Sequence, residues 1–425
     1  MTLVKTSLLN GIAVLVKMIT LLGLNKILAL YVGPSGYAAM GQFQNAVQMI
    51  TTFASGAINT GVTKYTAEHF DAPEKQQTLW KTAGTLSLGV SIFTSMLIVV
   101  LNEQLAEFFL NDKKYGGVFL WFGATLTLFT LNALLLAVLN GKKEISRYVV
   151  ANIVGSCFAL FVTSLLAMTK GLYGALVALA VYQSLSFIIT FLISFRAPWF
   201  KCSYFFGAVD RNFALNLAKF SAMALVSALC VPISHVMVRT HLTAEFGQVS
   251  AGYWEAMFRF SSAYLIVLTS TLSVYLLPRL SELKSLQEIS REVIYVYKFI
   301  LPAVLLMGVC IYFLRGLIIS LLFSSEFSPM ENLFFWQLVG DFMKVGSWVL
   351  GYVMISRAQF KAFVGCEIVF SFSFVLLTAW LGSYYGLVGV VLAHALNYFI
   401  YWLVVTTLVF KRSWFVQGAA DVSEG

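Results

Sequence analysis

The chain has 425 residues, of which 59% are hydrophobic and only 11% are charged, with a formal net charge of +9 and a mean hydropathy of +0.84. A soluble domain carries roughly a quarter charged residues, so the composition excludes that class. Apolar runs of about 20 residues recur along the chain, long enough to cross a hydrocarbon core of about 30 Å. A β-barrel is disfavoured because its strands alternate apolar with polar residues. We therefore predict an all-α polytopic membrane protein.

Hydropathy predicts twelve membrane spans joined by short connections. They cover approximately 8–31, 38–67, 79–101, 117–140, 147–168, 171–195, 213–238, 250–278, 293–314, 329–356, 361–382 and 386–410. The first run continues past Lys17 without a cleavage site, so we interpret it as an uncleaved span rather than a signal peptide.

The longest connection, 196–212, predicts a division of the chain into two six-helix bundles. The N-terminal bundle would cover 1–195, the connection would be a cytoplasmic linker, and the C-terminal bundle would cover 213–412, followed by a cytoplasmic tail at 413–425. Two short matches with nearly the same offset suggest that the halves are repeats: LVKTSL (3–8) with LAKFSA (217–222), and GYAAM (36–40) with GYWEA (252–256). Repeats of six spans share one orientation, which implies a pseudo-two-fold axis along the membrane normal and a central cavity.

The distribution of Lys and Arg predicts the orientation, because cytoplasmic loops are enriched in both. If the termini are cytoplasmic, most basic residues outside the spans lie on that side. The opposite side holds Lys113, Lys114, Lys170, Arg239 and Arg315. We therefore expect both termini to be cytoplasmic.

Several charged residues fall inside the predicted spans, where each costs about 2.5–3.5 kcal/mol at a helix centre. Lys17, Arg259 and Lys344 are deep, and Lys26 is intermediate. Lys64, Lys219 and Lys298 lie close enough to span ends to reach the headgroups. The acids within spans are chiefly Glu255 and Asp341, with Glu367 near an edge. The deep charges should line an interior rather than face lipid.

The stretch FFWQLVGDFMKVGSWVLGY, residues 334–352, separates into two faces when projected as a helix. The polar arc contains Gln337, Gly340, Asp341, Lys344, Ser347, Trp348, Gly351 and Tyr352. Asp341 and Lys344 are three residues apart and could pair, either to neutralise each other or to serve a ligand. Glu255 and Arg259, four residues apart, permit the same two interpretations.

The second span carries an uncharged polar face with Gly41, Asn45, Gln48, Thr52, Gly56, Asn59 and Thr63. Amides and hydroxyls there could bind a hydroxylated ligand or form ordinary inter-helix hydrogen bonds, and both interpretations stay open.

The residues favour a ligand rather than a reaction. The five cysteines form no CxxC pair or cluster with histidine, so no metal site, cofactor or disulfide framework is predicted. His235, His241 and His394 are isolated in the sequence. The sequence contains no paired-carboxylate motif of the kind that an integral-membrane enzyme would need. The deep charges are net basic and suit phosphate or diphosphate, while abundant aromatic side chains suit sugars. An amphiphilic phospho-glycolipid fits, although a proton-coupled exporter of small solutes could also be built this way.

Several stretches carry a resemblance to a known family. KILALYVGPSGYAAM (26–40) resembles the segment joining the first two helices of polysaccharide-export flippases of the MOP superfamily. The stretches at 61–77, 273–283, 291–304 and 334–358 resemble Wzx-type translocases, particularly the lipid III flippases of enterobacterial common antigen assembly. The resemblance extends in order over nearly the whole chain.

The resemblance implies twelve helices in two bundles, alternating access and an inner-membrane location. It implies transport of undecaprenyl-diphosphate-linked oligosaccharides to the periplasmic leaflet, with the common antigen or O-antigen unit as glycan. Polymerase, ligase and chain-length regulator partners are implied; nucleic acid is not. An alternative is a cation-coupled drug exporter of the same superfamily, which would need an acidic lumen.

The candidate site residues follow from depth, charge and the matched motifs. For substrate binding they are Lys17, Lys26, Lys64, Arg259, Lys344, Asn45, Gln48 and Asn59, and for coupling or gating they are Asp341, Glu255 and Glu367.

Overall fold

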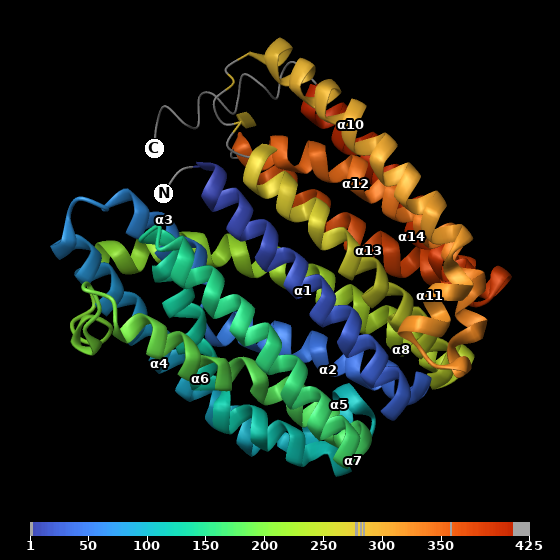
Figure 1. The fold of residues 1–425 in the computed structure, drawn as a ribbon, viewed down its shortest axis with the longest axis horizontal. Coiled ribbons are helices and arrows are strands. Elements are labelled where there is room, and N and C mark those ends of the chain that lie inside the picture. Colours follow the sequence, from blue (N-terminus) through green and yellow to red (C-terminus); the bar gives the residue numbers. More distant parts are fainter. Residues whose placement is uncertain (1–2, 277–278, 281–282, 284, 358, 411–425) are drawn as a thin grey trace. The chain divides into compact units, whose positions relative to one another are not determined.

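The computed structural model describes residues 3–410 except 277–278, 281–282, 284 and 358 (Figure 1). Within these residues the chain forms helices and no strand. The α-helices are α1 (Leu3–Tyr31), α2 (Gly33–Ala54), α3 (Asn59–Glu68), α4 (Pro73–Val100), α5 (Asn102–Leu110), α6 (Gly116–Gly141), α7 (Ile145–Phe195), α8 (Arg211–Thr271), α10 (Leu286–Phe313), α11 (Arg315–Leu322), α12 (Phe334–Ser356), α13 (Phe360–Tyr385) and α14 (Leu387–Phe410). Short 3₁₀ or π turns cover Lys113–Tyr115, Cys202–Tyr204, Leu272–Leu276 and Ser325–Leu333.

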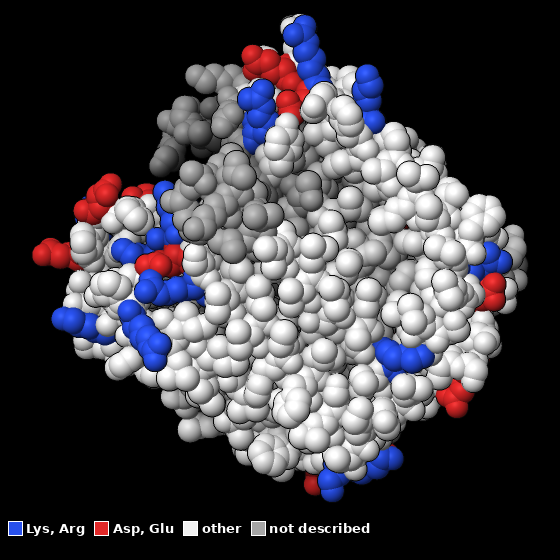
Figure 2. Space-filling model, in the orientation of Figure 1, with Lys and Arg blue, Asp and Glu red and all other residues white. Residues whose placement is uncertain are grey.

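Eight helices in the described part of the chain are long and apolar enough to cross a membrane. Figure 2 shows no charged side chain over the middle of α6 and α7, while charged side chains gather near helix ends. This is the surface that a hydrocarbon environment requires, because buried charges without partners are costly in lipid. The predicted all-α membrane class is therefore confirmed.

Two helices are far longer than one membrane crossing. The 51 residues of α7 would extend about 77 Å at 1.5 Å per residue. They bend instead at Gly171, which has φ 55° and ψ −135°. The 61-residue α8 bends at Gly247, with φ 81° and ψ 164°. Both backbone conformations lie in a region that glycine adopts at little cost.

The bend at Gly171 falls where a boundary between two spans is predicted, but the bend in α8 does not. The helix continues past the expected end at 238, through Arg239, and bends only at Gly247. Arg239 therefore lies within a helix and not in the connection between two helices that the sequence predicts. The physical reason is that the segment from Arg239 to Phe246 contains neither glycine nor proline to stop the helix.

The predicted second span is also interrupted. α2 ends at Ala54 and α3 begins at Asn59, with Gly56 at φ 63° and Ala57 at φ 52° between them. A left-handed backbone is uncommon for alanine. Irregular backbone at membrane depth is tolerated where protein buries it or where it lines a cavity.

By internal packing the chain divides into two compact units. Unit 1 comprises Met1–Val32 and Ala39–Pro232, and unit 2 comprises Gly33–Ala38 and Ile233–Gly425. The division falls inside α8, and the first turns of α2 belong to unit 2. The bundle boundaries expected from the sequence, 1–195 and 213–412, stay a prediction, and the tail at 413–425 lies outside the described residues.

In unit 1 the connection between α7 and α8 is docked on α4 rather than extended. Thr85 Oγ1 donates a hydrogen bond to the Gly207 carbonyl at 3.0 Å, and the backbone N–H of Asp210 donates to Thr82 Oγ1 at 3.0 Å. The ring of Phe205 stacks on buried Trp80, with 5.8 Å between centroids. Glycine at position 84 permits this approach, because a Cβ there would lie 1.8 Å from the Phe205 carbonyl oxygen.

We expect Gly84→Ala to loosen the 196–212 connection, because the new methyl group forces two backbones apart. Overpacking of this kind costs about 1–3 kcal/mol. Trypsin cleavage after exposed Lys201 should become faster in the purified protein, whereas Gly89→Ala, on the same helix with no neighbour within 4 Å, should change nothing. Equal cleavage rates for the two variants would contradict the docking.

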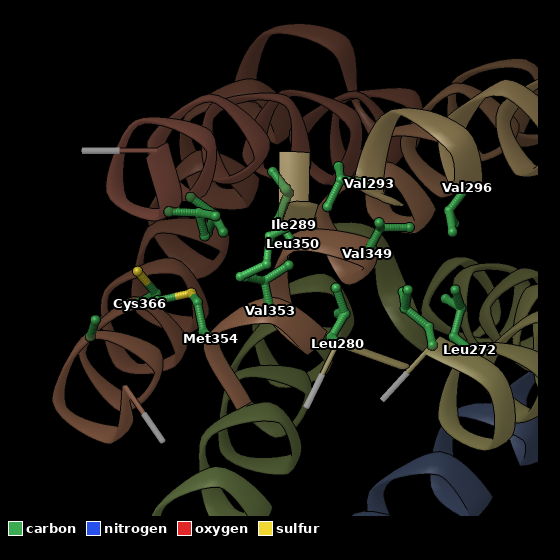
Figure 3. Close-up of a cluster of buried hydrophobic side chains, with 14 of the residues drawn as sticks. Leu272, Leu280, Ile289, Val293, Val296, Val349, Leu350, Val353, Met354 and Cys366 are labelled. Atoms are coloured by element: carbon green, nitrogen blue, oxygen red, sulfur yellow. The ribbon is translucent and has the colours of Figure 1, made fainter. Parts of the chain in front are cut away.

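An apolar cluster in unit 2 joins the residues around Leu272 and Leu280 to α10, α12, α13 and α14 (Figure 3). Ile289 and Val293 of α10 meet Val349, Leu350 and Val353 of α12 in Figure 3. This packing fixes the rotation of α12 about its axis. It therefore determines which side chains of α12 can contact polar groups of α8 and α14.

Unit 2 also brings together the two segments that the repeat analysis relates. A Cβ at Gly252 would lie 1.7 Å from the carbonyl oxygen of Pro34, so the α2 and α8 backbones touch there. Tyr37 is fully buried, with its ring centroid 5.2 Å from that of Phe327, and Tyr253 contacts the same Phe327 ring at 6.0 Å. The GYAAM and GYWEA motifs thus pack around one aromatic side chain.

Candidate functional site

A buried ion triad lies on α8 in unit 2. Nε of Arg259 donates to Glu255 Oε1 at 2.8 Å, and Nη2 of Arg239 donates to the other carboxylate oxygen, Oε2. Arg239 is 1% exposed and Glu255 3%, so this carboxylate is held between two arginines away from solvent. The guanidinium carbon of Arg239 also lies 5.3 Å from the centroid of the Trp254 ring. That of Arg259 lies 5.7 Å from the centroid of the Tyr37 ring.

The expected Glu255–Arg259 pair is therefore present, but sequence analysis missed its third member. Arg239 is one of the largest fully buried side chains in the described residues. The sequence feature that indicates its position is the absence of glycine and proline between His235 and Gly247, which allows the helix to continue. A helix that continues to Gly247 carries Arg239 into the interior instead of into a loop.

Asp341 of α12 is the centre of a second polar cluster in unit 2 and is 1% exposed. Ser261 Oγ donates to its Oδ2 at 2.6 Å, and the Tyr264 hydroxyl donates to the same oxygen. Gln337 Nε2 donates to Oδ1 at 3.1 Å, and His394 Nε2 lies 3.3 Å from Oδ1. The cluster joins α8, α12 and α14.

His394 was interpreted as isolated, and the structure corrects this. The imidazole of α14 reaches Asp341 across 53 positions of sequence. Glycine at 340 makes room for it, because a Cβ there would lie 2.2 Å from the His394 ring. The juxtaposition depends on the packing of α12 against α14, which sequence spacing does not reveal.

The expected ion pair between Asp341 and Lys344 is absent from the described residues. Lys344 Nζ lies instead among three aromatic rings, 5.8 Å from that of Phe258, 5.3 Å from Trp348 and 5.2 Å from Tyr398. A cation over an aromatic face is stabilised by about 0.5–1 kcal/mol at exposed sites and more when desolvated. Ser261 and Tyr264 of α8 and Gln337 of α12 donate hydrogen bonds to the Asp341 carboxylate, so the carboxylate is satisfied without an ion pair to Lys344.

The polar arc of α12 does face the interior of unit 2. Gln337, Gly340, Asp341, Ser347 and Gly351 are buried. The opposite face is buried as well in its second half, through Val345, Val349, Leu350 and Val353. The helical projection thus predicts correctly that the polar arc of α12 is buried, but it does not predict that the apolar face is also buried in its second half.

Glu367 of α13 stands apart from both clusters. It is half-buried, and the Tyr401 hydroxyl of α14 donates to its Oε1 at 3.4 Å. Together with the triad, Asp341 and Lys344, these described groups of unit 2 comprise three cations and three carboxylates. The net basic character that the sequence predicts for the deep charges of the whole chain stays a prediction.

In unit 1 the polar face of α2 and α3 lines two cavities. A cavity of about 520 Å³ is bordered by six polar residues, Asn59, Thr60, Thr63, Lys64, Asn140 and Tyr148. A second, of about 240 Å³, has Gln44, Gln48, Thr51, Tyr182 and Gln183 in its lining. Three predicted residues, Gln48, Asn59 and Lys64, therefore border cavities, while Asn140, Tyr148 and Gln183 were missed.

The other predicted residues of unit 1 do not border these cavities. Asn45 is 8% exposed, and its side-chain nitrogen has no hydrogen-bond partner. Lys17 is exposed on α1, and Lys26 is half-buried on the same helix. The side chain of Lys219 lies outside the described residues.

Solved structures with the same fold cover nearly the whole chain. An inward-facing multidrug resistance MATE family transporter of the MOP superfamily has a TM-score of 0.77 at 14% identity, over 97% of this chain and 98% of that chain. The lipid II flippase MurJ in an inward closed conformation has a TM-score of 0.73 at 14% identity, over 98% and 90%. The chain therefore shares its fold with these two structures.

Sequence comparison defines the family more narrowly. The family described as polysaccharide biosynthesis protein matches residues 27–332. The lipid III flippases of Escherichia coli (strain K12) and Shigella flexneri are each 31% identical over 402 residues, covering 94% of this chain and 96% of the relative. The chain belongs to this polysaccharide biosynthesis protein family, as a Wzx-type transporter, and the predicted resemblance is confirmed.

Proposed function

We propose that the chain is a flippase that moves undecaprenyl-diphosphate-linked oligosaccharide units from the cytoplasmic to the periplasmic leaflet of the inner membrane. The observation that carries this proposal is the 31% identity with two lipid III flippases over 94% of the chain. The ammonium group of Lys344, which lies among three aromatic rings, suits a diphosphate. A transporter of this kind binds and moves its substrate without a catalytic residue or a cofactor.

The topology we propose has twelve crossings in two six-helix bundles around a central cavity. α7 and α8 would each cross twice, bending at Gly171 and Gly247, and α2 with α3 would form one broken crossing. Both termini would be cytoplasmic, as the Lys and Arg distribution favours. The bundles 1–195 and 213–412, joined by the linker 196–212, would move so that the central cavity opens alternately to the two sides of the membrane. Pro232 and Pro302 lie inside helices and would allow these helices to bend.

The candidate residues divide by role in this proposal. Lys344 and Arg259 would attract the diphosphate, with Lys17, Lys26 and Lys64 on its route, while Asn45, Gln48 and Asn59 would serve the glycan. Asp341, Glu255 and Glu367 would couple or gate the movement. Asp341 is the strongest of the three, because its partners lie on three helices that must rearrange for it to be released.

A cation-coupled drug exporter is the second function that the fold admits, since a multidrug MATE transporter shares it. The charges disfavour that function: a cationic drug needs an acid without a donor, and the two buried carboxylates among the described residues, Glu255 and Asp341, are satisfied by donors.

Membrane lipids would surround the protein, and a polymerase and a chain-length regulator would act on the translocated glycan.

Complementation tests the function and the glycan together. In cells that lack their own lipid III flippase, expression of this chain should restore the surface polymer. Restoration only in cells lacking an O-antigen flippase would reassign the glycan. Failure in both, with the protein present in the membrane, would contradict the proposal.

In the same assay, Lys344→Gln should lower the amount of restored surface polymer at least about tenfold. The reason is that the variant loses the hydrogen bond that Lys344 would donate to the charged diphosphate. Lys113→Gln removes an exposed lysine paired with Glu107 and should retain activity.

A further inference from the structure

An apolar pocket in unit 1 lies between the connection 196–212 and the helices α6 and α7. Phenylalanine contributes five of its nine lining side chains and leucine three, and the ninth is Cys202. The pocket has a volume of about 90 Å³, and its accessible lining is wholly apolar. A buried water needs several polar partners, whereas an apolar cavity stays dry and accepts a hydrocarbon guest. The pocket therefore suits a hydrocarbon group.

Aromatic contacts hold the walls of this pocket in place. The ring centroid of Phe200, in the connection, lies 5.6 Å from that of Phe191 in α7 and 5.5 Å from that of Phe205. Phe205 belongs to the same buried apolar cluster as Leu134 of α6. Cys202, which also lines the pocket, is exposed. The pocket is thus formed by the docked connection and is open to the surface at Cys202.

A basic side chain stands directly beside the pocket. Lys201 lies between Phe200 and Cys202 in the chain, which both line the pocket, and it is itself exposed. Its ammonium nitrogen lies 5.6 Å from the centroid of the Tyr204 ring. Arg196, at the end of α7, is exposed as well. Within the part of the chain that the structure describes, neither basic residue forms an ion pair.

Two acids belong to the connection or contact it, and both have donors of their own. Oδ1 of Asp210 accepts a hydrogen bond from the backbone N–H of Phe213 at 2.9 Å. Oε1 of Glu144 accepts from Trp199 Nε1 at 3.2 Å, and its Oε2 accepts from Arg147 Nη1 at 2.7 Å. The positive charge beside the pocket is therefore left for an anion from outside the described chain.

We propose that the pocket and Lys201 form a site for an anionic phospholipid of the surrounding membrane. The acyl segment nearest the glycerol occupies the pocket, and the phosphate faces Lys201. Lipid tails are as apolar as leucine, so the pocket alone would not choose among lipids. The charge supplies the choice, because basic pockets at the cytoplasmic side of membrane helices bind anionic headgroups. The site does not depend on the proposed function: it would hold the connection 196–212 against α6 and α7.

The size of the pocket favours an acyl chain over the prenyl chain of a glycolipid. A volume of about 90 Å³ accommodates about three groups of the size of a water molecule, each taking up roughly 30 Å³. That is enough for a short run of methylene groups in an unbranched chain, but it is less than one branched isoprenoid unit requires. The expected occupant is therefore a phospholipid.

Photo-crosslinking of the full chain in phosphatidylcholine nanodiscs tests the site. The probes are trace amounts of phosphatidylglycerol and phosphatidylcholine with a diazirine at the same acyl carbon, close to the glycerol. Mass spectrometry identifies the modified peptides. We expect phosphatidylglycerol to modify the segments that line the pocket about fivefold more than phosphatidylcholine does, the change that one lysine beside an anionic headgroup supplies.

Variants separate the charge from the pocket. Lys201→Gln should lower the yield with phosphatidylglycerol to the yield with phosphatidylcholine, and Lys201→Arg should keep it. Lys75→Gln is the matched control, because Lys75 is an exposed lysine of α4 that does not line the pocket. Cys202→Trp fills the mouth of the pocket and should abolish modification by both lipids. Lys201→Gln changes an exposed side chain, so it decides the question even if Cys202→Trp does not fold.

Three results would overturn the proposal. The first is equal modification of the pocket by the two lipids, or a yield with phosphatidylglycerol that Lys201→Gln does not lower. The second is stronger modification by diazirine-labelled farnesyl diphosphate than by phosphatidylglycerol, which would assign the pocket to the glycolipid. The third is an equal loss in Lys75→Gln and Lys201→Gln, which would show a general effect of surface charge and no site at Lys201.

Discussion

Replacing Glu255 with glutamine is expected to destabilise unit 2 by about 3–5 kcal/mol, the usual cost of removing one partner of a buried ion pair. The carboxylate accepts hydrogen bonds from Arg239 and Arg259, and it is 3% exposed. A neutral amide cannot balance two guanidinium groups, of which Arg239 is 1% exposed. The variant keeps the size of the side chain, so the loss would come from charge and not from a cavity.

Unfolding of the purified protein in mixed micelles, followed by tryptophan fluorescence against denaturing detergent, measures this loss. Glu107→Gln is the matched control, because Glu107 pairs with Lys113 at 3.4 Å with both side chains largely exposed. Exposed pairs of this kind contribute about 0–1 kcal/mol. Equal midpoints for the two variants would show that the triad is not what stabilises unit 2.

Asp341→Asn is expected to keep the fold and to lose at least about tenfold in transport rate. Asparagine fills the same space, but it removes the charge that Ser261, Tyr264 and Gln337 serve as donors. A hydrogen bond to a charged group contributes about 1.5–3 kcal/mol, and each 1.4 kcal/mol corresponds to a factor of ten. The neutral amide also cannot exchange a proton with His394, 3.3 Å away.

The readout is the initial rate of glycolipid translocation in vesicles, normalised to the amount of folded protein. Ser261→Ala is the companion variant: it removes one donor and leaves the carboxylate charged, so its rate should fall less. If Asp341→Asn transported at the wild-type rate, Asp341 would be a structural residue and the coupling role would pass to Glu255 or Glu367.

Much of the fold follows from the sequence because long apolar runs admit few alternatives in a membrane. The bend of α7 at Gly171 coincides with a predicted boundary for that reason. The sequence predicts that a helix ends near residue 238, where polar residues begin, but no glycine or proline terminates the helix between Arg239 and Gly247. The prediction therefore places Arg239 in a connection, and the ion triad does not emerge from the sequence.

The site was only partly predictable, for a different reason. Helical periodicity identified residues that share a face, such as Gln337 and Asp341, or neighbours within a helix, such as Glu255 and Arg259. It could not pair Asp341 with His394, because that contact depends on how α12 packs against α14. The cavities of unit 1 show the same limit: Gln48 and Asn59 belong to the polar face predicted for the second span, whereas Asn140 and Tyr148 lie on helices for which that face specifies no orientation.

The most direct test of the central claim is reconstitution of the purified wild-type chain in vesicles with a fluorescent polyprenyl-diphosphate-linked oligosaccharide. A membrane-impermeant quencher reports the fraction of label in the outer leaflet over time. We predict protein-dependent movement of the glycolipid between leaflets, faster than in empty vesicles. The same leaflet distribution as in empty vesicles, together with transport of a cationic dye by the same preparation, would contradict the account.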